Sequence, residues 1–82
     1  MNFMKGENPL YTINVAKIKG KMAEKGYTNT RLSEVVGVSR NTLANYFSNP
    51  NNMPYELVGK LASILCDSDE EAAGIFFAQK LA

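Results

Sequence analysis

Histidine is absent from the 82 residues, and cysteine occurs only once, as Cys66. These scarcities exclude zinc sites built from cysteine and histidine, histidine-based catalytic triads and any internal disulfide. Cys66 falls at the end of an apolar helical pattern, so we expect a small core residue, with a reactive thiol as the alternative. A lone thiol fits a reducing cytoplasm. We therefore predict neither a cofactor nor a metal site.

Long apolar runs and strand-like alternation are also missing. The first ten residues, MNFMKGENPL, contain no apolar run long enough for a signal peptide or a membrane span. We therefore expect a soluble protein located in the cytoplasm, with no membrane partner. Helix formers dominate, and the length suits one small core. The predicted fold class is all-α, with an N-terminal arm over residues 1–11 and one domain over residues 12–82.

Five apolar stripes at helical spacing predict five helices. We expect the lysines of the first helix, Lys17, Lys19, Lys21 and Lys25, to stay exposed, either on a solvated face or, for some of them, in contact with phosphates. The helix ends carry suitable caps, with serine or threonine at three starts and glycine after two ends. The predicted helices span residues 13–25, 28–36, 39–47, 54–66 and 68–79. The predicted N-caps are Thr12 or Asn14 for the first helix, and Thr28, Ser39 and Ser68 for the second, third and fifth. Pro54 is the first residue of the fourth helix, and Gly26 and Gly37 are the C-caps of the first and second. Ser68 and Glu71 have the spacing of a capping box.

The stretch TNTRLSEVVGVSRNTLANYF, residues 28–47, organises the chain. It predicts two short helices joined at Gly37, the first with an apolar stripe of Leu32, Val35 and Val36. Val38 fills the corner between the helices. Glycine suits this turn because it enters the left-handed region without steric cost.

The second helix of this stretch has two different faces. At about 100° per residue, Arg40, Ala44, Asn41 and Asn45 fall within an arc of roughly 140°. The apolar residues Leu43, Tyr46 and Phe47 lie on the other side. One face therefore packs, and the other offers a guanidinium, two carboxamides and a methyl group. These groups match the major-groove edges of base pairs, where arginine pairs with guanine and asparagine with adenine.

The same stretch resembles the helix-turn-helix of phage repressors and Cro-type regulators, the lambda-repressor-like family. The resemblance places Asn29 at the first position of the motif, Ser33 at its small fifth position, Gly37 at the turn and Leu43 at the buried position of the recognition helix. The family usually has Gln at the first position and Ala at the fifth. Ser33 is small enough for the close approach of the two helices. The implied fold is a compact five-helix DNA-binding domain.

The resemblance implies sequence-specific binding of double-stranded DNA by a small transcriptional repressor of phage or prophage type. Helix 39–47 would lie in the major groove, where Arg40, Asn41 and Asn45 would read base edges. The phosphate contacts would come from short polar side chains around it, namely Thr28, Asn29, Ser39, Thr42 and Asn51. Because one half-site of this size binds weakly, we expect a homodimer on a palindromic operator. At this length we expect a Cro-type protein rather than a two-domain switch, and no small-molecule ligand.

The two ends of the chain differ in charge. Residues 1–55 carry seven basic and three acidic side chains, whereas residues 56–82 carry two basic and five acidic ones. A basic first part and an acidic tail favour a polyanion on one side of the molecule, and ordinary solvated faces are the alternative. Lys5 could bring the arm to DNA, although a frayed terminus is the other interpretation.

Two other functional classes compete with DNA binding. Phe76 and Phe77 are adjacent on a short terminal helix, so either both cover the core or one forms a homodimer contact. The same pair keeps open a protein–protein interaction module, such as an antitoxin or an anti-repressor partner. The polar face with Arg40, Asn41 and Asn45 argues against that module. An enzyme is disfavoured, because no carboxylate lies within an apolar stretch that would shift its pKa.

Overall fold

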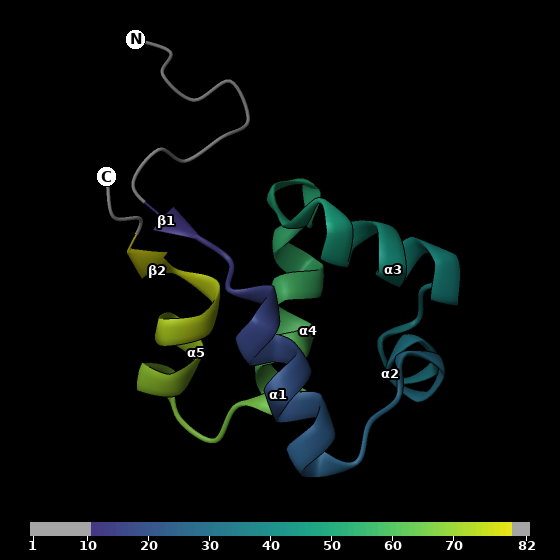
Figure 1. Ribbon diagram of the computed structural model, residues 1–82, viewed down its shortest axis with the longest axis horizontal. Helices are drawn as coiled ribbons and strands as arrows, with labels where there is room; N and C mark the ends of the chain where they lie inside the picture. Colours follow the sequence, from purple (N-terminus) through teal and green to yellow (C-terminus); the bar gives the residue numbers. More distant parts are fainter. Residues whose placement is uncertain (1–10, 80–82) are drawn as a thin grey trace, which may run out of the picture.

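The computed structural model describes residues 11–79, which form five α-helices, one short 3₁₀-helix and two very short strands. The predicted all-α class is confirmed by the five helices (Figure 1). In chain order the elements are β1 (Tyr11–Thr12), α1 (Val15–Lys25), α2 (Asn29–Val36), α3 (Arg40–Ser48), η1 (Pro50–Asn52), α4 (Tyr55–Leu65), α5 (Asp69–Phe76) and β2 (Ala78–Gln79). Of the predicted arm, residues 1–10 lie outside the described residues.

The core is built around α4, which lies behind α1 in Figure 1. Helix α4 contributes four buried side chains to the core, and each of the other four α-helices contributes two. Completely or almost completely buried are Ile18 of α1, Leu32 of α2, Leu43 of α3, and Leu61 and Leu65 of α4. Burying each of these side chains contributes about 1.5–3 kcal/mol. The helices are therefore held by one common core, and α2 and α3 are part of it.

The helix starts follow the predicted caps. The side chains of Asn14, Thr28 and Ser39 each accept a hydrogen bond from a backbone N–H of the first turn. Gly26 and Gly37 end α1 and α2 with φ values of 79° and 81°. In that left-handed region a Cβ atom is strained, so glycine at these two positions ends the helices as predicted.

The end of α5 differs from the prediction. The helix was expected to reach Gln79 but stops at Phe76, and Ala78–Gln79 pairs antiparallel with Tyr11–Thr12. The carbonyl of Ile75, which residue 79 would bond in a longer helix, instead accepts from the N–H of Asn14 at 2.8 Å. The start of the domain therefore takes the place of the missing helical turn. Strands of two residues are too short to show an alternating pattern, so the sequence could not reveal them.

The fourth and fifth helices begin with small departures. Helix α4 spans Tyr55–Leu65, and Pro54 stands at its N-cap instead of its first position. At α5 the Ser68 hydroxyl accepts from the Glu71 N–H, as the capping box requires. The Glu71 carboxylate, however, accepts from the N–H of Asp67 at 2.7 Å and not from that of Ser68. The serine half of the capping box is therefore present, whereas the glutamate bonds the backbone of the residue before the N-cap.

Some side chains differ from their predicted burial. Val35 was assigned to the apolar stripe of α2 but is 43% exposed, whereas Ser33, expected at the close approach of the two helices, is buried. The Ser33 hydroxyl donates to the Thr30 carbonyl at 2.8 Å, so its burial leaves no unsatisfied donor. Lys21 was expected to be exposed, yet only 12% of its side chain is exposed. Cys66 is half-buried beside the core, and burial raises the pKa of its thiol.

Candidate nucleic-acid interface

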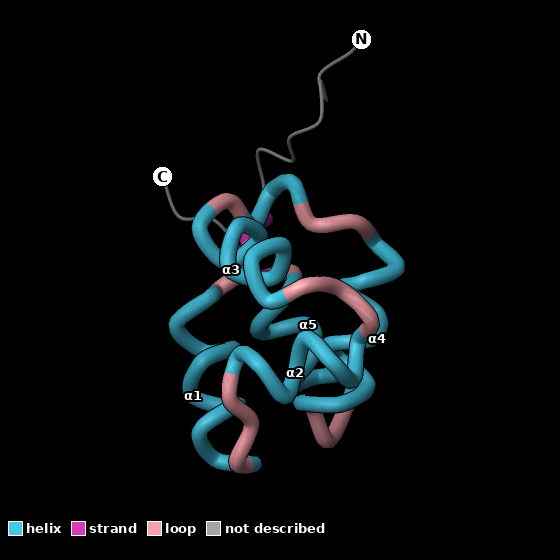
Figure 2. Tube along the Cα trace, turned by 90° about the vertical axis from the view of Figure 1, so that its right-hand side faces the viewer, coloured by secondary structure: helices cyan, strands magenta, loops and turns pink. Residues whose placement is uncertain are grey.

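Helices α2 and α3 form one unit at the end of the molecule opposite α5 (Figure 1). The view turned by 90° brings this end towards the reader (Figure 2). Two backbone N–H groups, those of Gly37 and Val38, donate to the Ser33 carbonyl at 2.9 and 3.1 Å. Val38 packs against the core, and Ser39 then caps α3. The turn is therefore fixed by hydrogen bonds and by an apolar contact.

Helix α3 separates its buried and exposed side chains as the angular pattern predicts. Leu43 and Phe47 are buried, and Tyr46 and Thr42 are half-buried. The side chains predicted to read bases lie on the exposed face, which consists of Arg40, Asn41, Ala44 and Asn45. This face combines the five donors of a guanidinium with two carboxamides that can both donate and accept. It is therefore able to make bidentate hydrogen bonds to base edges.

The candidate phosphate contacts lie at three places around this unit. Thr28 and Asn29 are at the start of α2, exposed and half-buried respectively. Ser39 and Thr42 form the first turn of α3, where the Ser39 hydroxyl donates to the Thr42 hydroxyl at 2.8 Å and accepts from the Thr42 N–H. Asn51 is exposed in η1, beyond the other end of α3. These polar groups therefore lie at the start of α2 and beside both ends of α3.

Few charges accompany α3. Arg40 is its one charged residue, and its Nη1 atom lies 3.5 Å from the Thr30 hydroxyl oxygen. Lys19 of α1 places its ammonium 5.9 Å from the centre of the Phe47 ring, near the last turn of α3. Neither Thr30 nor Lys19 was among the predicted site residues. Thr30 comes to α3 from α2 and Lys19 comes to α3 from α1, and spacing along the chain carries no signal for such contacts.

Some of the basic side chains in the first part of the sequence form ion pairs with acidic side chains of the last part. Lys21 of α1 lies 2.9 Å from Glu71, 3.0 Å from Glu24 and 3.8 Å from Asp67, and Lys25 lies 2.9 Å from Asp67. The basic first part and the acidic tail therefore pair with each other here, and these two lysines do not serve a polyanion. The interpretation of the charge asymmetry as a surface for a polyanion therefore loses the contribution of Lys21 and Lys25.

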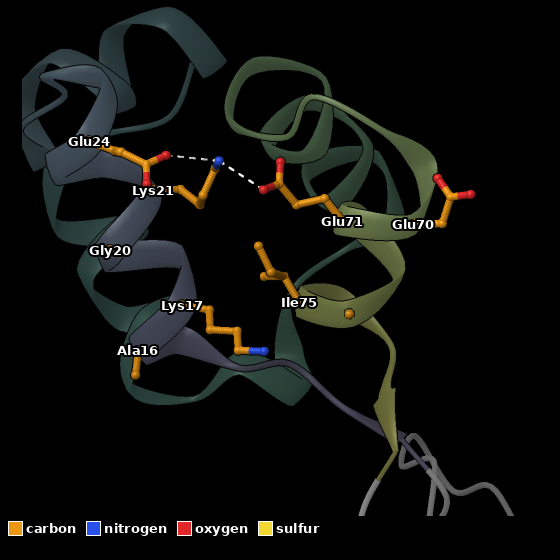
Figure 3. A pocket seen from close by; sticks show the side chains of 9 residues that line it. Ala16, Lys17, Gly20, Lys21, Glu24, Glu70, Glu71 and Ile75 are labelled. Carbon is orange, nitrogen blue, oxygen red and sulfur yellow. Dashed lines mark hydrogen bonds and ion pairs between the residues drawn. The ribbon is translucent and has the colours of Figure 1, made fainter.

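These ion pairs also shift the pKa values of their members. The hydrogen bond and charge of Lys25 lower the pKa of Asp67, with a smaller contribution from Lys21. The pKa of Glu71 is lowered first by the Asp67 backbone N–H and then by Lys21. The carboxylates in turn raise the pKa of Lys21. The pairs close one end of an open groove of about 620 Å³ between α1 and α5, with Ala16, Gly20 and Ile75 along it (Figure 3).

The predicted dimer contact at Phe76 and Phe77 is reduced to one residue. Phe76 is 3% exposed and belongs to the core of the domain, so it has no surface to offer a second copy. Phe77 follows α5 and is 49% exposed. Phe77 is the C-cap of α5, where the backbone leaves the helical conformation with φ −132° and ψ 41°, so it does not continue the buried face of Ile75 and Phe76.

No group of three or more His, Cys, Asp or Glu side chains in residues 11–79 is arranged to hold a metal ion. None of the helices in the same range has the length and apolar character that crossing a membrane requires.

Comparison with known proteins agrees with the geometry of α2 and α3. A helix-turn-helix family model matches residues 18–65, which is more than half of the chain and runs from α1 to the end of α4. No curated protein and no solved structure matched the chain. The matched region contains the capped α2, the left-handed turn at Gly37 and all three predicted base-reading side chains. The chain therefore belongs to the lambda-repressor-like helix-turn-helix family, whose members are DNA-binding regulators of transcription.

Proposed function

We propose that the protein binds a specific double-stranded DNA sequence through α3, which enters the major groove. Arg40 donates to a guanine edge, and Asn41 and Asn45 pair with adenine edges. Each good bidentate pair contributes roughly 1–3 kcal/mol of discrimination against a wrong base. The observation that carries this proposal is the division of α3, because its apolar side chains are buried while Arg40, Asn41 and Asn45 are all exposed.

The phosphate contacts in this proposal set the register of α3 in the groove. They come from Thr28, Asn29, Ser39, Thr42 and Asn51. These side chains are short and neutral, so they support hydrogen bonds to phosphate oxygens more than they support charge neutralisation. Arg40 and Lys19 are the cations associated with α3 among the described residues. We therefore expect a binding affinity that falls with salt less steeply than that of a strongly basic regulator.

The biological form we propose is a small repressor of phage or prophage type, acting in the cytoplasm as a homodimer on a palindromic operator. A homodimer doubles the small contact that one α3 makes, and Phe77 offers an exposed aromatic surface for it. No catalytic role and no cofactor form part of this proposal.

A second candidate is a protein-binding module on the same fold, such as an antitoxin or an anti-repressor partner. Exposed aromatic side chains favour it, since Tyr55 is 84% exposed and Phe77 is also accessible. Such a module would bind through these apolar groups and would not need the polar face of α3. DNA binding is the better supported of the two because α3 places its polar, hydrogen-bonding side chains outward.

The deciding experiment is selection of bound sites from random duplex DNA, followed by titration of the selected duplex at several salt concentrations. We expect a defined motif with two-fold symmetry and an affinity that decreases with salt. If the selection recovers only random sequences, and if the amount of protein retained on bulk DNA does not depend on salt concentration, DNA recognition is excluded and the protein-binding module remains.

A further inference from the structure

The side chain of Arg40 reaches from α3 back to α2. Its Nη1 atom lies 3.5 Å from the hydroxyl oxygen of Thr30, ten residues earlier, and both residues are exposed. At this length and exposure, the contact contributes little to the stability of the fold. It nevertheless joins the one charged side chain of the recognition helix to a neighbouring helix.

Thr30 itself is held in place from two sides. Its carbonyl accepts the 2.8 Å hydrogen bond from the buried Ser33 hydroxyl. It lies in the first turn of α2, which Thr28 caps through the Arg31 N–H. Threonine is also branched at Cβ, so its side chain has few rotamers. The Thr30 hydroxyl therefore has a well-defined position. A free arginine side chain, by contrast, has many conformations and loses conformational entropy when it binds.

A hydroxyl partner suits a base-reading arginine better than a carboxylate does. Arg31 shows the contrast, because its Nη1 lies 3.7 Å from the Glu34 carboxylate. A carboxylate competes with a base for the same donors and offsets the positive charge. A hydroxyl does not carry a charge, and the contact with Thr30 engages only Nη1. The opposite edge of the planar guanidinium, Nε with Nη2, remains able to donate two parallel hydrogen bonds to guanine.

We propose that Thr30 is a positioning residue for base recognition, which holds the Arg40 guanidinium in the orientation that pairs with a guanine edge. The contact reduces the number of Arg40 conformations before DNA arrives, so less conformational entropy is lost when the base is bound. The inference rests on the proposed function, in which Arg40 reads a base. It adds a specificity-determining side chain on α2, outside the recognition helix.

The test compares Thr30→Val, which removes the hydroxyl and keeps the shape, with Thr30→Ser, which keeps the hydroxyl. The full chain is first used to select its preferred duplex, and Arg40→Ala identifies the base pair that Arg40 reads. Each protein is then titrated with that duplex and with the three duplexes that differ at this base pair. Ser63→Ala, at an exposed position of α4, is the control for loss of a surface hydroxyl.

We expect Thr30→Val to lower discrimination at the Arg40 base pair about three- to tenfold, while Thr30→Ser and Ser63→Ala retain it. Thermal melting of Thr30→Val should be the same as that of the wild type, because the lost hydrogen bond is exposed. If Thr30→Val weakens all four duplexes equally, Thr30 contacts a phosphate and the positioning role is excluded. If Thr30→Val changes nothing while Arg40→Ala relaxes the motif, the positioning role is wrong but the proposed function stands. If the wild-type chain selects no duplex, both proposals fail together.

Discussion

The two ends of the molecule use polar side chains in opposite ways. At the α1–α5 end, Lys21 and Lys25 pair with carboxylates of the acidic tail and tie helices together. At the α2–α3 end, Arg40 contacts only a hydroxyl among the described residues, and Asn41 and Asn45 are directed to solvent. The comparison shows that charge in the sequence is divided between holding the fold and remaining available for a partner.

The largest effect on stability should come from a substitution on the buried face of α3, compared with one on its exposed face. Leu43→Ala removes a completely buried side chain, so we expect a loss of about 2–5 kcal/mol in the free energy of unfolding. Asn45→Ala, two residues further along the same helix, should change it by less than about 0.5 kcal/mol. Urea denaturation of both variants measures the difference. Equal losses would show that the exposed face also supports the fold.

The next effect concerns DNA recognition by the α2–α3 end. Arg40→Ala should remove about 1–3 kcal/mol of discrimination at one base pair in each half-site. Asn29→Ala should instead weaken binding to all duplexes about equally, because a phosphate contact carries no sequence information. Binding titrations with the selected duplex and single-base variants distinguish the two results. A selected motif that is unchanged by Arg40→Ala would contradict the role assigned to this side chain.

Glycine provides a matched comparison between the two ends. Gly37 has a φ of 81°, so Gly37→Ala should destabilise the α2–α3 turn by about 1–2 kcal/mol. Gly20 lies inside α1, and an added Cβ meets nothing within 4 Å there. Gly20→Ala should therefore stabilise the protein by about 0.5–1 kcal/mol. Thermal melting of both variants is the measurement, and shifts of the same sign would disprove this explanation of the turn.

The smallest effect is a pH dependence at the α1–α5 end. Folding lowers the pKa values of Asp67 and Glu71 from their ordinary values of 3.8 and 4.5. The unfolded chain therefore takes up protons first as the pH falls, and the contribution of these groups is complete above about pH 5 and is lost as the pH falls through the lowered values. The Asp67 side chain is 71% exposed and that of Glu71 is 33% exposed, so screening by solvent keeps the contribution small.

Lys21→Met tests this pH dependence by removing the central cation. The difference in melting temperature between pH 7 and pH 3 should be smaller in Lys21→Met than in the wild type. Lys17→Met, an exposed lysine on the same helix, is the control and should keep the wild-type difference. Identical pH profiles for all three proteins would show that the ion pairs do not stabilise the fold.

Local signals account for the parts of the structure that were predicted correctly. Capping side chains at Thr28 and Ser39 and the glycine at position 37 act within a few residues of themselves, so they can be recognised in the sequence. The same holds for the exposed and buried sides of α3, which follow from a helical period. The failures at Lys21 and at the end of α5 involve partners that are distant along the chain, namely Glu71 and Asn14.

The sequence by itself determined the helical class, the two caps and the turn of the α2–α3 unit, and the separation of Leu43 from Arg40, Asn41 and Asn45. Each of these depends on backbone geometry within one or two helical turns. Only the tertiary structure decided that Lys21 pairs with Glu71, that Asn14 ends α5 by bonding Ile75, and that Arg40 meets Thr30. Such contacts depend on how helices pack around the shared core of α4, and the spacing of residues along the chain does not contain that information.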